Sequence, residues 1–207
     1  EWKNSLDRKP LVLKGARQVG KTWLMKEFGK THYKNYVYFN FDEEDALKSI
    51  FESNKNPQRI IDLLSFIADE KIVPNETLII FDEIQECPNA LNSLKYFKEK
   101  ANAYHVIAAG SLLGTLLSQP KSYPVGMVNI LNIYPLTFDE FLEATEPTLS
   151  KYYSSIIKEQ NIEEIFHNKL LDAYNYYLIV GGMPECVHSW ITYKDPKKVS
   201  KIQNELI

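Results

Sequence analysis

The sequence has little cysteine, no long apolar run and almost no net charge. Its 207 residues include two cysteines, Cys87 and Cys186, which are far apart, so we expect no disulfide framework and a reducing compartment. The longest weakly polar run, residues 106–117, is too short to span a bilayer, which takes about 20 apolar residues. The formal net charge of −3 provides no overall attraction to nucleic acid or to anionic membranes. We therefore expect a cytoplasmic protein without a membrane-spanning segment.

The composition itself is typical of a folded globular protein, with 44% apolar and 25% charged residues. A length of 207 residues predicts one domain with a sizeable appendage, or two small domains. Because the chain begins with Glu1 rather than Met and ends inside a helical pattern, we expect it to be a piece of a longer protein.

Over the first two-thirds of the chain, short apolar runs alternate with helical patterns, which predicts a parallel sheet covered by helices on both faces. From Thr137 onward the patterns are helical only, and Gly181, Gly182 and Pro184 should end one helix and begin the next. We expect an α/β domain over residues 1–143 and a helical lid, or the start of a C-terminal domain, over residues 144–207. The expected strands are 11–14, 36–41, 77–81, 104–109 and 128–133. The expected helices are 21–28, which Gly29 should end, and 58–69, 89–100, 138–144, 151–160 and 162–180.

Residues 15–22, GARQVGKT, fit the phosphate-loop pattern G-x4-G-K-[ST] and stand between an apolar strand and a helical pattern, as that motif requires. Gly15 and Gly20 let backbone N–H groups turn toward phosphate oxygens, and the following helix adds the positive end of its dipole. Lys21 should reach the β- and γ-phosphates, and the hydroxyl of Thr22 should ligate Mg²⁺. The competing interpretation is a glycine-bearing turn with a surface lysine. The predicted nucleotide-binding set is Gly15, Ala16, Arg17, Gln18, Val19, Gly20, Lys21, Thr22 and Trp23, with Trp23 either near the base or facing the sheet.

A phosphate loop needs a carboxylate that holds the metal, and residues 78–85, LIIFDEIQ, supply one. Asp82 follows four apolar residues and should lie at the carboxyl end of a buried strand, where it would hold Mg²⁺ through water. Glu83 would then orient and partly deprotonate an attacking water. The alternative for both is an acidic cap at a loop start. The N-K-x-D signature of GTP-binding domains is missing, which favours ATP.

The fourth expected strand ends in Gly110 and Ser111, which would place a small hydroxyl beside the phosphates. Ser111 would hydrogen-bond the attacking water or the γ-phosphate, although a Gly-Ser pair is also an ordinary turn. Arginine occurs only at Arg8, Arg17 and Arg59, so no arginine is available beyond residue 59 to stabilise charge in a transition state.

The order of these motifs resembles the ATPase core of the AAA+ superfamily of the type with a catalytic glutamate. More narrowly, the blocks RKPLVLKGARQVGKTWL, IIFDEIQ, AAGSLLG, YPLTFDEF and GGMPE resemble a family of uncharacterised bacterial and archaeal AAA-type ATPases, over residues 2–185. The resemblance implies a P-loop three-layer sandwich with strand order 5-1-4-3-2, Lys21, Glu83 and Ser111 in catalytic roles, and Thr22 and Asp82 at the metal. Many relatives carry a Gly-Arg pair where this chain has Gly126 and Met127, so that arginine is absent.

The leading hypothesis is a Mg²⁺-dependent ATPase whose nucleotide state drives an attached domain or a partner. The alternatives are a nucleotide-gated switch that turns over slowly, a small-molecule phosphotransferase, and a DNA-binding module controlled by ATP. The expected partners are ATP and ADP, an unidentified client or the protein's own further domain, and a second copy of the chain, while nucleic acid has little support.

Other features of the sequence indicate structural roles. The four histidines show no spacing suited to zinc. The tyrosines between Tyr152 and Tyr177 indicate helix packing, and the lysines at 194–201 indicate a solvated helix face.

Overall fold

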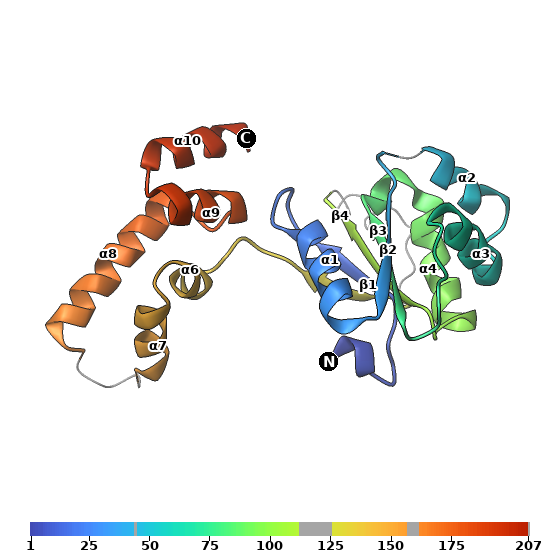
Figure 1. The fold of residues 1–207 in the computed structure, drawn as a ribbon, viewed down its shortest axis with the longest axis horizontal. Helices are drawn as coiled ribbons and strands as arrows, with labels where there is room; N and C mark the ends of the chain where they lie inside the picture. The colour runs from blue at the N-terminus through green and yellow to red at the C-terminus, as the bar shows by residue number, and fades with distance from the viewer. Residues whose placement is uncertain (44, 112–125, 157–161, 207) are drawn as a thin grey trace. The chain divides into compact units, whose positions relative to one another are not determined.

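The protein is described by a computed structural model that covers residues 1–43, 45–111, 126–156 and 162–206. The chain forms two compact units, Glu1–Ile133 and Tyr134–Ile207 (Figure 1). The sequence suggested a boundary near residue 143 instead. The division comes earlier because Phe141 is buried in the core of the second unit.

The first unit is built on a five-stranded sheet in which every pairing is parallel. The strand order is β2-β3-β4-β1-β5, which confirms the predicted fold class and the order that the resemblance implied. Lys14 is level with Gly110 and with Asn132, and Asn40 is level with Asp82, so these strand ends share one edge of the sheet. The strands are β1 (Leu11–Lys14), β2 (Asn35–Asn40), β3 (Thr77–Asp82), β4 (His105–Gly110) and β5 (Asn129–Asn132).

Helices cover both faces of this sheet (Figure 1). On one face, Leu78 and Ile80 of β3 pack with Met25 of α1 (Lys21–His32), and on the other Ile79 and Phe81 pack with α2, α3 and α4. Central strands are apolar on both sides because neither face meets water, which explains the run LIIF. The other elements are the short 3-10 helices η1 (Trp2–Asn4) and η2 (Ile84–Glu86), and the helices α2 (Asp45–Ser53), α3 (Pro57–Ile67) and α4 (Pro88–Lys100).

Two local predictions about these helices were wrong. Helix α1 does not end at Gly29 but continues to His32, and a Cβ at Gly29 would lie 2.9 Å from the Tyr36 side chain, so this glycine provides packing space rather than a stop signal. Helix α2 was not expected. It is short, and it buries Leu47, Ile50 and Phe51 on one face, a spacing that is hard to distinguish from a loop in so few residues.

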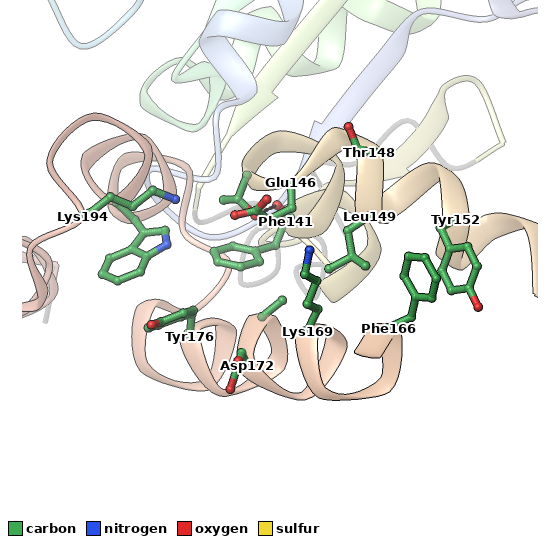
Figure 2. Close-up of a pocket in the computed structure, with 13 residues that line it drawn as sticks. Phe141, Glu146, Thr148, Leu149, Tyr152, Phe166, Lys169, Asp172, Tyr176 and Lys194 are labelled. Atoms are coloured by element: carbon green, nitrogen blue, oxygen red, sulfur yellow. Dashed lines mark hydrogen bonds between the residues drawn. The ribbon is translucent and has the colours of Figure 1, made fainter. Parts of the chain in front are cut away.

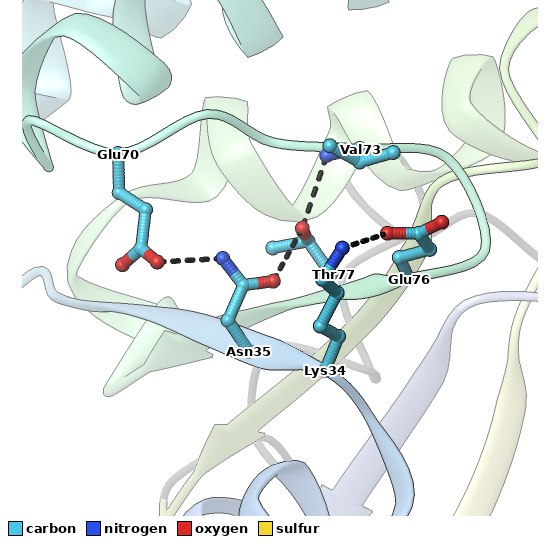
Figure 3. A network of polar contacts seen from close by, with 6 residues as sticks. All are labelled: Lys34, Asn35, Glu70, Val73, Glu76 and Thr77. Atoms are coloured by element: carbon cyan, nitrogen blue, oxygen red, sulfur yellow. Dashed lines mark hydrogen bonds and ion pairs between the residues drawn. The ribbon is translucent and has the colours of Figure 1, made fainter.

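At the amino ends of β2 and β3, a network of polar contacts ties the two strands to the loop before β3 (Figure 3). The hydroxyl of Thr77 donates to Asn35 Oδ1 at 2.6 Å and accepts from the Val73 N–H at 3.0 Å. The Asn35 amide donates to Glu70 at 2.7 Å, and Lys34 pairs with Glu76 at 3.2 Å. This network lies at the end of the strands opposite Asp82, so it stabilises the sheet without touching that edge.

The second unit is a group of helices, as the sequence predicted. Its core contains Phe141, Val180, Val187 and Trp190. A capping box between Thr137 and Glu140 begins the first helix. The elements are α6 (Phe138–Thr145), α7 (Pro147–Ser155), α8 (Glu164–Val180), α9 (Pro184–Tyr193) and α10 (Pro196–Glu205).

Two of the sequence expectations can be compared with these bounds. Gly181, with φ of 72°, follows the end of α8, and Pro184 begins α9, as expected. The helix expected over 151–160 corresponds to α7, which begins earlier, at Pro147, and ends at Ser155; residues 157–160 lie outside the described residues. None of the described helices combines the length and apolar character needed to cross a membrane.

Candidate nucleotide-binding site

The predicted phosphate loop connects β1 to α1. Lys14 ends β1 and Lys21 begins α1, so residues 15–20 form the turn between a central strand and a helix N-terminus. Gln18 and Gly20 have φ values of 64° and 87°, in the left-handed region, and Val19 between them is buried. The exposed residues of the loop are Ala16, Arg17 and Gln18.

Gly15 has a packing role that the motif alone did not indicate. A Cβ at this position would lie 2.3 Å from the carbonyl oxygen of Ile133, just beyond the end of β5, and 3.1 Å from Val19 Cγ2. A side chain here would therefore push the loop away from the neighbouring edge strand. Glycine at position 15 is required by the sheet as well as by the approach of any ligand.

The side chain of Lys21 folds back onto the loop. It is buried, with 6% of the residue exposed, and Nζ donates to the carbonyl oxygens of Gly15 at 3.0 Å and Ala16 at 2.6 Å. Burial lowers the pKa of Lys21 from its ordinary value, whereas the negative charges of Glu83 and Asp82 oppose that shift. The ammonium group is thus held at the loop by two backbone carbonyl groups.

Asp82 joins the loop helix to the sheet. Its residue is 3% exposed at the end of β3, and Oδ2 accepts a hydrogen bond from Thr22 Oγ1 at 2.6 Å. Its other oxygen, Oδ1, accepts from the Glu83 N–H at 3.0 Å. A hydroxyl and a carboxylate are the oxygen ligands that Mg²⁺ takes, so the chemistry of this pair fits such an ion.

The side chain of Tyr38 also contacts Asp82, and the sequence did not identify it as part of the site. Its hydroxyl donates to Asp82 Oδ2 at 3.0 Å, and Lys26 Nζ lies 3.6 Å from the centre of its ring. Burial, and then the charge of Asp82, raise the pKa of Tyr38 well above its ordinary value, so the hydroxyl is a donor at neutral pH. Only the pairing of β2 with β3, which the sequence does not state, identifies this contact.

Glu83 adopts a backbone conformation that is rare for a residue with a side chain. Its φ and ψ are 47° and 44°, in the left-handed region, where strain often accompanies function. The amide of Gln85 donates to the Glu83 carboxylate, and the Gln85 Oε1 atom is buried without a partner among the described residues. Gln85 is a second residue that sequence reasoning missed, although it lies within the same LIIFDEIQ block.

Ser111 follows β4 directly. Gly110, the last residue of β4, is level with Lys14, the last residue of β1. Ser111 therefore lies level with the start of the phosphate loop. Its Oγ atom is buried and has no hydrogen-bond partner in the described part of the chain. A buried hydroxyl without a partner is costly, which is a reason to expect a water or a ligand there.

The three arginines differ in their surroundings. Arg8 donates to the backbone carbonyls of Lys3 and Asn102, and Arg59 donates to that of Ile50 at 2.8 Å, so both hold the fold together. Arg17 is exposed on the loop and makes no hydrogen bond or ion pair with another described residue.

Trp23 is 65% exposed, so it does not face the sheet, which was one of its two predicted positions.

A model of an AAA domain family matches residues 7–142, a range that contains the loop, Asp82 and Ser111. The chain belongs to this family. Membership confirms the resemblance that the sequence motifs suggested.

This AAA domain protein is 26% identical over 191 residues to an uncharacterized protein of Methanocaldococcus jannaschii, with 92% of the chain and 38% of the relative aligned. The chain thus spans about 38% of that relative's length. Its fold is similar to the Walker-type ATPase of Pyrococcus abyssi (TM-score 0.58, 16% identity, 99% of this chain and 69% of that one). It is also similar to a chain of the Drosophila ORC bound to DNA (TM-score 0.50, 16% identity, 100% and 59% covered). At these identities the likeness concerns the fold.

The AAA domain protein also has a cavity of about 790 Å³ within its second unit (Figure 2). Tyr152 and Phe166 stack with ring centres 3.8 Å apart at one end, and Tyr176 and Trp190 contact each other at 4.9 Å at the other. The tyrosines between 152 and 177 pack between helices, as predicted. Tyr153, Tyr174 and Tyr177 contact Phe138, while Tyr152 and Tyr176 pack on Phe166 and Trp190 and also line this cavity. No predicted site residue lies here.

Proposed function

We propose that this AAA domain protein binds ATP together with Mg²⁺ and hydrolyses it, and that the nucleotide state drives a change in an attached domain or a partner. The observation that carries the proposal is the hydrogen bond of 2.6 Å between Thr22, at the start of the helix after the loop, and the buried Asp82. It supports a site in which the loop binds phosphates beside a pair of oxygen ligands for the metal.

In this proposal Lys21 exchanges the carbonyls of Gly15 and Ala16 for β- and γ-phosphate oxygens when ATP enters. Backbone N–H groups of residues 15–20 and the N-terminus of α1 supply further positive potential. Thr22 and Asp82 would hold Mg²⁺, which when bound neutralises charge on the phosphate oxygens. Exposed Trp23 remains available to the base or the ribose.

For hydrolysis, Glu83 would orient the attacking water and accept its proton. The amide of Gln85 donates to Oε2 of this carboxylate and orients it, and Oε1 would then accept the proton. The Ser111 hydroxyl, which has no partner among the described residues, would hydrogen-bond the water or the γ-phosphate. Water as the acceptor makes the protein an ATPase rather than a phosphotransferase.

The second candidate function is a nucleotide-gated switch that binds ATP or ADP and turns over slowly. It is favoured by the arginines, because Arg8 and Arg59 hold backbone carbonyls and only Arg17 is placed on the loop. A partner, a second copy of the chain or a further domain of a longer protein would then supply the missing positive charge.

We also propose that the protein works in the cytoplasm, which the two buried, unpaired cysteines support. DNA binding remains a weaker alternative. Two lysines of the basic C-terminal run lie over aromatic rings of their own unit, Lys198 at 3.3 Å from Tyr193 and Lys194 at 5.4 Å from Trp190, which favours a structural role for them.

Steady-state phosphate release from ATP, measured with Mg²⁺ and with EDTA, tests the main proposal. Mg²⁺-dependent turnover supports the ATPase. Nucleotide that stays bound through purification with negligible turnover supports the switch, and phosphate release that requires an added acceptor supports a phosphotransferase. Absence of both binding and turnover contradicts the proposal.

A further inference from the structure

Tyr38 is the one aromatic hydroxyl in contact with Asp82 among the described residues. It belongs to β2, its ring lies beneath Lys26 of α1, and its hydroxyl meets Asp82 at the end of β3. Three different elements therefore fix its position. The hydroxyl oxygen lies on the axis about which the ring turns, so ring rotation does not move it away from Asp82.

The hydrogen bonds of Asp82 leave its carboxylate little freedom. Oδ2 accepts from Thr22 and from Tyr38, and Oδ1 accepts from the Glu83 backbone. A carboxylate offers roughly four lone-pair positions, so about one remains for a metal ion or for a water bound to it. Without Tyr38, Oδ2 would keep the Thr22 donor and Oδ1 the Glu83 N–H, so the carboxylate would lose one of the three hydrogen bonds that fix its orientation.

We propose that Tyr38 is a positioning residue for the magnesium site: its hydroxyl holds Asp82 in the orientation that leaves one lone pair directed to the metal. This inference rests on the proposed function, because it concerns the same site. The inference goes beyond the proposed function because it makes the affinity of the site for Mg²⁺ depend on a residue of the neighbouring strand, in addition to the loop and the Asp-Glu pair. Tyr38 itself touches neither nucleotide nor metal in this account.

Tyr36 provides a matched control. It lies two residues earlier on the same strand and on the same face, since both side chains pack with the cluster beneath α1, and it is level with Leu78 rather than near Asp82. Replacing either tyrosine with phenylalanine removes one hydroxyl and leaves the ring. A general effect of losing a hydroxyl from this face should thus appear in both variants.

The test is binding of a fluorescent ATP analogue to the parent chain, Tyr38→Phe and Tyr36→Phe, titrated with Mg²⁺ and repeated in EDTA. We expect Tyr38→Phe to need about 10- to 100-fold more Mg²⁺ for half-maximal tight binding, with affinity in EDTA close to that of the parent. Tyr36→Phe should match the parent in both conditions. Urea unfolding of each variant checks that the fold is retained.

The outcomes separate the two proposals. An unchanged Mg²⁺ requirement in Tyr38→Phe, a lowered one, or an equal loss with and without Mg²⁺ overturns the role of Tyr38 while the parent still binds nucleotide. If the parent chain binds no nucleotide with Mg²⁺, the proposed function itself fails.

Discussion

Thr22 and Asp82, sixty positions apart in the chain, share a hydrogen bond of 2.6 Å between the first turn of α1 and the end of β3. The bond forms because β3 and β1 both flank β4 in a parallel sheet, which brings their carboxyl ends to one edge. Ligands of open α/β sheets bind at that edge.

Replacing Glu83 with Gln should separate binding from chemistry. The amide keeps the shape of the side chain but cannot accept a proton, so ATP hydrolysis should fall by about 10²- to 10⁴-fold while ATP affinity stays close to the parent. Glu86→Gln, an exposed change in the same 3-10 turn, is the control. Hydrolysis at the parent rate in Glu83→Gln would mean that Glu83 is only a cap.

Replacing Arg17 with Ala should show whether this residue supplies the positive charge that stabilises the γ-phosphate during ATP hydrolysis by the isolated chain. An arginine at the γ-phosphate is worth about 10³- to 10⁵-fold in rate, so slow hydrolysis is expected unless one is supplied. If Arg17 supplies it, the rate does not depend on protein concentration and is lost in Arg17→Ala. If a second copy supplies it, specific activity rises with concentration. Turnover of tens per second by dilute monomeric Arg17→Ala would show that no arginine is needed.

His105 should make the first unit less stable in mild acid. Burial, and then the charges of Arg8 and Lys3, lower the pKa of His105 to about 4, and its ring contacts the Tyr33 hydroxyl at 2.6 Å. An unfolded histidine has a pKa near 6.5, so the unfolded state binds more protons between about pH 6.5 and 4. Stability should therefore be fully present above pH 6.5 and decline toward pH 4, by about 1–2 kcal/mol at pH 5.

Urea unfolding at pH 7.5 and pH 5.0 measures this effect. His105→Gln should lose less stability than the parent between the two pH values, because glutamine does not titrate. Identical pH dependence in the parent and in His105→Gln would refute the assignment.

Thr77→Val should lower stability without affecting nucleotide binding. Valine has nearly the same shape, but the Asn35 oxygen and the Val73 N–H lose their partner in the network of Figure 3. The expected loss is about 1–3 kcal/mol of unfolding free energy, measured with urea, at unchanged ATP affinity. Thr31→Val, whose hydroxyl is exposed, should cost less. A large change in ATP affinity at unchanged unfolding free energy would contradict a purely structural role for Thr77.

The sequence was sufficient to predict the parallel sheet and the position of the loop, because the fully buried strands β3 and β4 are apolar runs and GARQVGKT stands between the apolar strand β1 and a helix. The edge strand β5 is exposed along its length, so its apolar residues gave a weaker signal. These signals are local, so they need no knowledge of neighbouring strands. The family match over residues 7–142 agrees with them.

The rest of the site depends on contacts between distant residues. Tyr38 reads as an ordinary strand tyrosine until β2 is placed beside β3, and Gln85 reads as a polar loop residue until its amide meets Glu83. Gly29 likewise looks like a helix stop but provides space for Tyr36. Strand pairing and side-chain packing determine these roles, and the local sequence pattern does not predict them.

Calorimetric titration of Lys21→Ala with ATP and Mg²⁺ tests the central claim most directly, with Lys30→Ala as the control because Lys30 is an exposed lysine of the same helix. Loss of the Lys21 ammonium group removes the charge that the loop presents to the β- and γ-phosphates. We predict no measurable ATP binding by folded Lys21→Ala and parent-like binding by Lys30→Ala. Micromolar affinity retained in Lys21→Ala would contradict the assignment of residues 15–22 as a phosphate loop.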